Sequence, residues 1–204
     1  MKKTLLAAIF CAMTATSPLF GQAHMQSLSF SGPSTIDITA TNTFILRVDL
    51  TFSGYSAIGL SYWLEVQCAL APFLTITNVT HYPPFPGGPD PVPISFITGG
   101  PDYCGASAGL GGTAFPNQVP PGTYHISDLT FMLAPGTPLG MYDLRSTTTT
   151  PRISSVSDTD FNDNPLPAAH FTINIVPEPS TLALLSLAGI SSGLVAYRRR
   201  KSAR

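Results

Sequence analysis

Oxygen-bearing side chains alternate along a short segment near residue 160, a pattern that suits a hard cation. Asp158, Asp160 and Asn162 are separated by single residues, and residues 163–164 add Asp-Asn. Calcium binds about six to eight oxygen ligands, so these three residues are candidate ligands of Ca²⁺. The segment lacks the glycine and the distant glutamate of an EF-hand loop. An Asx-rich turn is the alternative that we favour, and no other cofactor is indicated.

A second pattern, residues 105–109 (GASAG), fits the G-x-S-x-G motif of serine hydrolases. A nucleophile elbow needs a strand before the serine and a helix after it. Ser107 instead lies in a Gly-rich stretch that continues with Leu-Gly-Gly. We therefore expect a flexible loop there and no enzyme, with a secreted hydrolase as the least favoured alternative. The histidines are scattered at His24, His81, His125 and His170.

Trp63 is the single tryptophan and the candidate for stacking against a sugar ring. In a strand, neighbouring side chains point to opposite faces, so Trp63 and Tyr62 point apart. We expect Tyr62 in the core, which leaves Trp63 either packed in an opposing layer or exposed. Polysaccharide binding through Trp63 is therefore an alternative function.

These residues must be positioned by strands, because alternation of apolar and polar residues dominates the body of the chain. Thr43–Phe52 places five apolar side chains on one face, and Ala57–Cys68 repeats the pattern. In residues 123–133 the apolar parity changes, which predicts a β-bulge near Ser127-Asp128. Further candidate strands are residues 34–40, 73–80, 140–147 and 168–176.

The connections between these strands are rich in proline and glycine. Residues 81–93 should form an exposed, partly polyproline loop, and residues 99–122 a Gly/Pro-rich connection. No long amphipathic helix is indicated. Many short strands with frequent turns predict an all-β fold, a single Ig-like or jelly-roll β-sandwich.

Both ends of the chain have the composition of export signals. Residues 1–23 have a positive start, a short apolar centre and a small-x-small site, which predicts a signal peptide cleaved after Ala23. An uncleaved anchor is the alternative, which the short apolar centre disfavours. Residues 181–197 carry no charge and would form about 26 Å of helix, at the short end of a membrane span. The basic cluster that follows should stay cytoplasmic; it consists of Arg198, Arg199, Arg200 and Lys201.

The tripeptide Pro177, Glu178, Pro179 precedes that apolar segment. Residues 177–204 thus resemble the PEP-CTERM sorting signal of Gram-negative bacteria: a Pro-Glu-Pro motif, a hydrophobic helix and an Arg-rich end. The resemblance implies an exosortase-type membrane enzyme as partner, removal of the helix, and release or transfer to the cell surface. An ordinary tail anchor is the alternative.

Removal of both signals changes the charge and the cysteine content of the protein. Residues 24–176 contain three arginines, no lysine and ten acidic residues, a formal charge of −7. Such a surface repels nucleic acid and anionic head groups. Cys11 leaves with the signal peptide, so we expect Cys68 and Cys104 to form one disulfide in the oxidising compartment. Two free buried thiols are the alternative.

The body also resembles cohesin-like sandwiches. Residues 59–66 (GLSYWLEV) look like an early strand of that family, and residues 129–131 (LTF) with 138–144 (PLGMYDL) look like its penultimate hairpin. The resemblance implies a domain that binds partners or carries adhesion. We therefore expect a signal peptide (1–23), a β-sandwich (24–176) and a sorting signal (177–204). The expected function is that of an exported surface or biofilm-matrix protein with a structural or adhesive role.

Overall fold

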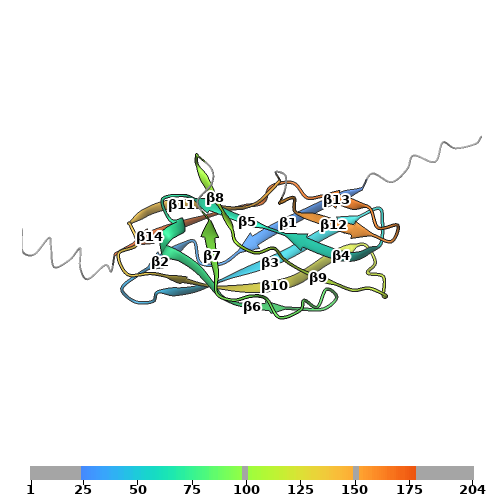
Figure 1. Cartoon of the computed structure of the whole chain (residues 1–204), viewed down its shortest axis with the longest axis horizontal. Helices are drawn as coiled ribbons and strands as arrows, with labels where there is room; N and C mark the ends of the chain where they lie inside the picture. Colours follow the sequence, from blue (N-terminus) through green and yellow to red (C-terminus); the bar gives the residue numbers. More distant parts are fainter. Residues whose placement is uncertain (1–23, 98–100, 149–151, 178–204) are drawn as a thin grey trace, which may run out of the picture.

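The computed structural model describes residues 24–97, 101–148 and 152–177 (Figure 1). The predicted signal peptide, the membrane segment 181–197, the basic cluster and most of the Pro-Glu-Pro motif lie outside these ranges. The described residues form strands and one short 3-10 helix, η1 (Ala71–Phe73), without an α-helix. No helix within these ranges combines the length and apolarity that a membrane crossing requires.

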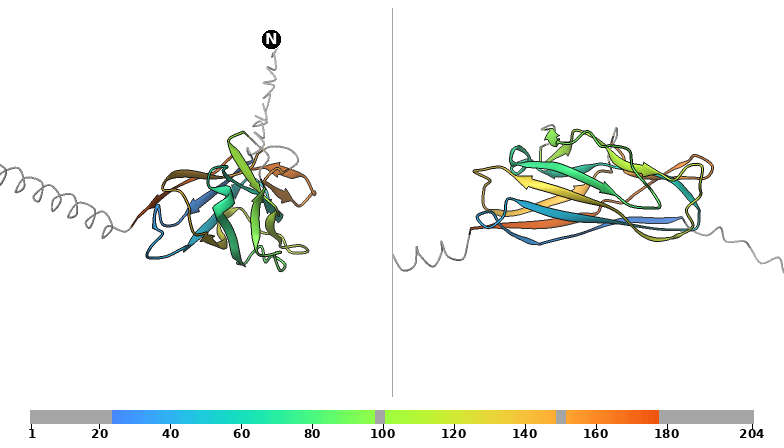
Figure 2. Two further views of the ribbon diagram at one scale, coloured as in Figure 1. Left: turned by 60° about the vertical axis from the view of Figure 1, so that its left-hand side comes forward. Right: turned by 90° about the horizontal axis from the view of Figure 1, so that it is seen from below.

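The strands form a two-layered sandwich, as predicted (Figure 2). One antiparallel layer has the order β1 (Met25–Ser31), β3 (Thr43–Ser53), β10 (Gly122–Leu133) and β6 (Leu74–His81). The other layer has the order β8 (Tyr103–Ala106), β5 (Leu64–Gln67), β11 (Gly140–Ser146), β14 (His170–Val176) and β2 (Thr35–Asp37). β7 (Ile94–Ile97) pairs with β6 and with β8 and joins the layers. A separate sheet contains β13 (Asp163–Pro165), β12 (Ser155–Asp158), β4 (Ala57–Tyr62) and β9 (Leu110–Thr113).

The core lies between the layers and follows the alternation in the sequence. In β3 every second residue from Phe44 to Phe52 is buried, while Ile45 and Arg47 are exposed. Full burial of one such apolar side chain stabilises the fold by about 1.5–3 kcal/mol. The predicted strand Ala57–Cys68 is divided at Trp63 into β4 and β5, and its inward parity is kept.

The predicted bulge in β10 is confirmed. The pairing of β10 with β3 shifts register between His125 and Ser127, so Ile126 is the additional residue. Ile126 and Ser127 are both buried. A bulge redirects the side chains beyond it, and here His125 and Asp128, on either side of the bulge, reach the same outer face.

The predicted disulfide is also confirmed. Cys68 and Cys104 are joined with their Cα atoms 5.0 Å apart, and they lie 36 positions apart in sequence. The link ties the end of β5 to β8. Closing a loop of this length stabilises the fold by about 3–4 kcal/mol on the chain-entropy model.

The prediction of an exposed loop at residues 81–93 was wrong in part. The side chain of Phe85 is 1 % exposed, and its ring contacts those of Phe52 and Tyr124. His81 Nε2 lies 2.7 Å from a carboxylate oxygen of Asp90 in a largely buried pair. One aromatic anchor and one polar pair therefore fold the proline-rich segment onto the sandwich. The connection 99–122 likewise contains two strands, β8 and β9.

The described body is elongated, and its two ends lie far apart. β1 begins at the right-hand end in Figure 1, where Met25 pairs with Ser53 at the end of β3. β14 ends at the opposite end, where Val176 pairs in parallel with Asp37 of β2. The first and last described strands therefore have their free ends at opposite ends of the body.

Candidate functional site

The three candidate calcium ligands lie in the turn between β12 and β13. The buried carboxylate of Asp158 accepts hydrogen bonds of 2.9 Å from the backbone N–H groups of Asp160 and Asn162. The side-chain amides of Asn162 and Asn164 donate to it at 3.3 Å. This is the geometry of the favoured Asx turn. No described cluster of three His, Cys, Asp or Glu side chains could hold a metal ion, and calcium binding stays a prediction.

These hydrogen bonds also set the charge state of Asp158. Burial raises the pKa of the carboxyl group, but the hydrogen bonds from Asn162, Asn164 and Asp160 together outweigh it. The pKa of Asp158 therefore lies below its usual value. The carboxylate is ionised and serves to order the turn.

Ser107 lies in the turn between β8 and β9, where its N–H donates to the carbonyl of Ser95 at 2.8 Å. A strand follows this turn, whereas a nucleophile elbow requires a helix. The four histidine side chains in the described ranges hydrogen-bond instead to Asn164, Asp90, Asp128 and Asp143. The G-x-S-x-G sequence is here a turn between two strands.

Trp63, the candidate glycan residue, is half-buried between β4 and β5. The guanidinium carbon of Arg152 lies 5.2 Å from the centre of its ring. Gly109 approaches so closely that a Cβ atom there would lie 2.8 Å from Cε2 and Cζ2. Tyr62 points into the core, as predicted. Much of the Trp63 ring is thus occupied by protein, and glycan binding through it stays a prediction.

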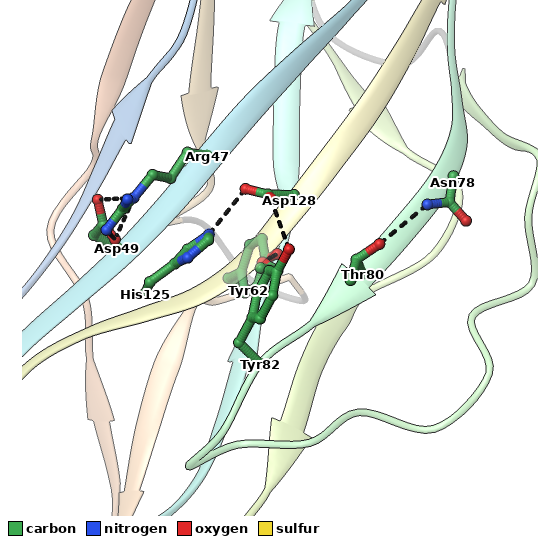
Figure 3. Close-up of polar contacts among 9 residues, drawn as sticks. Arg47, Asp49, Tyr62, Asn78, Thr80, Tyr82, His125 and Asp128 are labelled. Atoms are coloured by element: carbon green, nitrogen blue, oxygen red, sulfur yellow. Dashed lines mark hydrogen bonds and ion pairs between the residues drawn. The ribbon is translucent and has the colours of Figure 1, made fainter.

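The bulge in β10 builds a polar cluster on the outer face of the β3–β10–β6 layer (Figure 3). The carboxylate of Asp128 accepts a hydrogen bond of 2.9 Å from the Tyr82 hydroxyl and lies 2.9 Å from His125 Nε2. The rings of Tyr82 and His125 contact each other with centres 4.3 Å apart. The side chains of His125 and Asp128 are 26 % and 27 % exposed, so they are accessible and still fixed in position.

The same layer carries further paired polar side chains beside this cluster. Arg47 and Asp128 are partners in the ladder, as are Asp49 and His125. Arg47 Nε and Nη2 lie 2.9 Å from a carboxylate oxygen of Asp49 (Figure 3). The hydrogen bond to Asp49 raises the pKa of Arg47, and with the charges of Asp49 and Asp128 it outweighs the lowering effect of burial.

A second polar network lies on the outer face of the other layer. Arg145 binds Glu65 across the β11–β5 pair at 2.9 Å, and its guanidinium carbon lies 3.6 Å from the centre of the Tyr103 ring. The Tyr103 hydroxyl donates to Asp143 at 3.0 Å, and His170 Nδ1 lies 2.8 Å from the same carboxylate oxygen. Hydrogen bonds to Asp143 and Asp128 raise the pKa values of Tyr103 and Tyr82. Both phenols are therefore neutral donors, which suits binding surfaces.

Sequence reasoning predicted the bulge but missed both networks. The signal available was limited to the parity change near Ser127, which places His125 and Asp128 on one face. The contribution of Tyr82 comes from a segment that the sequence assigned to a loop. Pairing across β5, β8 and β11 depends on strand order, and β8 was not predicted.

A family model described as the PEP-CTERM protein-sorting motif matches residues 176–201. The C-terminus carries a PEP-CTERM protein-sorting motif. This match includes Pro177, Glu178 and Pro179 and the four basic residues, so the recognition made from the sequence is confirmed. The motif implies an exported, cell-surface-associated protein that an exosortase processes. No curated protein matches the chain.

Solved structures show what the body is similar to. A cohesin module from a family 33 glycoside hydrolase of Clostridium perfringens has a TM-score of 0.50 and 11 % identity, over 75 % of this chain and 98 % of the module. A type I cohesin from Pseudobacteroides cellulosolvens has a TM-score of 0.48 and 12 % identity, over 75 % of this chain and 93 % of the cohesin. The body therefore has the fold of a cohesin β-sandwich. Neither this fold nor the sorting motif indicates a catalytic domain.

Proposed function

We propose that this PEP-CTERM protein is a non-catalytic binding module, displayed at the cell surface or in the extracellular matrix, with a structural or adhesive role. One observation carries the proposal: the sorting match begins at residue 176, which is the last residue of β14. The sorting motif therefore follows the folded body without a spacer. Cleavage just beyond this point releases the sandwich with all of its strands intact.

The proposed maturation uses both ends of the chain. The signal peptide, residues 1–23, directs the chain through the inner membrane, and residues 181–197 hold it there until an exosortase-type enzyme acts. Residues 198–201 stop transfer on the cytoplasmic side. The body, residues 24–176, then lies outside, where the Cys68–Cys104 disulfide is stable.

The surface of the body suits a binding role outside the cell. Hydrogen-bonding side chains on both outer faces are held in place by partners, which lowers the entropy lost when a ligand binds. A formal charge of −7 disfavours nucleic acid and anionic membranes. A polysaccharide-binding role is the second candidate function, and the exposed aromatic pair described in the next subsection favours it.

Fractionation of the native cell tests the sorting step. We expect the triple variant Pro177→Ala, Glu178→Ala, Pro179→Ala to accumulate in the inner-membrane fraction, while the unaltered protein reaches the surface or the medium. Pro86→Ala, an exposed proline of the body, is the control. Equal surface delivery of the triple variant and the control would contradict the proposal.

A further inference from the structure

Two exposed phenylalanine rings meet at one end of the sandwich. Phe115 follows β9, and Phe161 lies between β12 and β13, yet their ring centres are 6.0 Å apart. Their side chains are 61 % and 70 % exposed. Among the described residues, no other aromatic contact joins two rings that are both exposed. The chain thus places two large apolar groups together in solvent.

Both loops hold the backbone of these two residues in fixed positions. The N–H of Phe115 donates to the carbonyl of Ile58 and to the Thr113 hydroxyl, at 3.2 and 3.1 Å. The N–H of Phe161 donates to the Asp158 carbonyl at 3.1 Å, inside the turn that the Asp158 carboxylate orders. The pair is therefore preorganised, and little conformational entropy is lost when a ligand covers it.

Phe161 also adopts a backbone conformation that its side chain disfavours. Its φ is 61°, and it is the single non-glycine residue with a positive φ in the described ranges. For a bulky residue this region of φ is sparsely populated and strained. Glycine or asparagine would relieve the strain, so the turn itself gives no reason for an aromatic residue here.

The pair lies at the end of the body that is remote from the sorting segment. The N–H of Phe115 is hydrogen-bonded to Ile58 near the start of β4, and Asp158 is the strand-pairing partner of Ala57. β3 ends at this same end, whereas β14 ends at the opposite one (Figure 1). The aromatic pair and the last residue of β14 therefore lie at opposite ends of the described body.

We propose that Phe115 and Phe161 form a binding site for a neutral polysaccharide. The apolar face of a sugar ring packs on an aromatic side chain, and its hydroxyl groups need hydrogen-bonding partners nearby. Asn117 and Gln118 are exposed on the loop of Phe115, and Asp160 is exposed beside Phe161. These side chains supply the donors and acceptors that sugar hydroxyls require.

The size and charge of the pair argue against other occupants. A phenylalanine buries about 150–250 Å², so two partly exposed rings offer roughly 200–300 Å². A stable contact with a second copy or another protein needs about 800 Å² from each partner. Asp160 and Asp163 flank Phe161, which disfavours an anionic lipid surface. A single uncharged polymer strand fits both the small area and the acidic rim.

Affinity electrophoresis of the mature protein, purified from the producing cells, tests the site. The probe is the fraction of shed polysaccharide that an anion-exchange column does not retain, cast into native gels. We expect this fraction to retard the protein, and Phe115→Ala and Phe161→Ala each to weaken binding about tenfold or more. Met141→Ala, an equally exposed apolar residue near the other end, should bind like the unaltered protein. Absence of retardation, or retardation that both phenylalanine variants retain, would overturn the proposal.

Two further measurements distinguish a polysaccharide from other ligands of the aromatic pair and control for misfolding of the variants. Phe161→Gly removes the ring and relieves the φ, so it should fold at least as well and still lose binding. Phe-dependent binding to vesicles of phosphatidylcholine and phosphatidylglycerol, or a dimer that Phe161→Ala dissociates, would refute the polysaccharide site. The inference rests on the proposed function only in that the mature protein lies outside the cell. The intact mass of the protein reports its processing, and the gel reports its binding. The proposed sorting and the proposed polysaccharide site can therefore fail independently.

Discussion

The hydroxyl groups of Tyr62 and Ser127 share a hydrogen bond of 2.5 Å across the core, linking β4 of the separate four-stranded sheet to the bulge of β10. Both side chains are fully buried. Tyr55 offers a contrast, because its buried hydroxyl oxygen has no hydrogen-bond partner. The same substitution should therefore have opposite effects at these two tyrosines.

We expect Tyr62→Phe to lower the free energy of unfolding by about 1–3 kcal/mol, since it leaves the Ser127 hydroxyl buried without a partner. Tyr55→Phe removes an unsatisfied group, so the free energy of unfolding should stay the same or rise by about 1 kcal/mol. Urea denaturation of both variants measures the difference. A larger loss for Tyr55→Phe than for Tyr62→Phe would show that this account of the core is wrong.

The half-buried Tyr55 also predicts sensitivity to alkali. Burial, aided by the charge of Asp158, raises the pKa of Tyr55 to about 12 from 10.0. The folded state then holds a proton that the unfolded chain releases, so stability is complete below pH 10 and falls as pH rises toward 12. Stability measured over this range should fall less steeply in Tyr55→Phe. An identical slope in the variant would exclude Tyr55 as a contributor.

The proline-rich segment 81–93 provides a third test, because Phe85 is buried in it while Val92 is 41 % exposed. Phe85→Ala should lower the free energy of unfolding by about 3–5 kcal/mol, as expected for a core phenylalanine. The control Val92→Ala should change it by less than about 0.5 kcal/mol. If thermal unfolding shows equal and small losses of unfolding free energy for both variants, the whole segment is an exposed loop, as the sequence suggested.

How far the sequence could predict the fold depended on the length of each strand. β3 has eleven residues in strict alternation, and its pattern alone determined its buried face. β7, β8, β9 and β12 have four residues each, which is too short for a period of two to be recognised. Their pairing is fixed by neighbours far away in the chain, and these contacts leave no local signal.

The same reason limited the prediction of surface sites. The disulfide followed from counting cysteines, but Phe115 and Phe161 are 46 positions apart and flanked by turn residues. Nothing in either segment indicates that the two rings meet. Trp63 was favoured as the sugar-stacking residue because of its type, whereas the structure places Arg152 and Gly109 against it.

Calcium provides a fourth test at the turn 158–164. Because N–H donors already surround the Asp158 carboxylate, we expect millimolar calcium to leave the unfolding temperature unchanged. The stability that Asp158 contributes is present above its usual pKa of 3.8 and is lost as pH falls through its lower folded pKa. A rise in unfolding temperature with calcium that Asp160→Ala abolishes would instead support Asp158, Asp160 and Asn162 as ligands.

Intact-mass spectrometry of the mature protein from its native cell tests the central claim most directly. The account predicts a chain that begins at His24, ends between residues 177 and 181, and is lighter by two hydrogen atoms than its reduced form because of the Cys68–Cys104 disulfide. Loss of the segment 181–197 and of the basic cluster would show that the C-terminal motif is a sorting signal that is removed by cleavage. A mature protein that retains Arg204 would contradict exosortase-type sorting and leave an ordinary membrane anchor in its place.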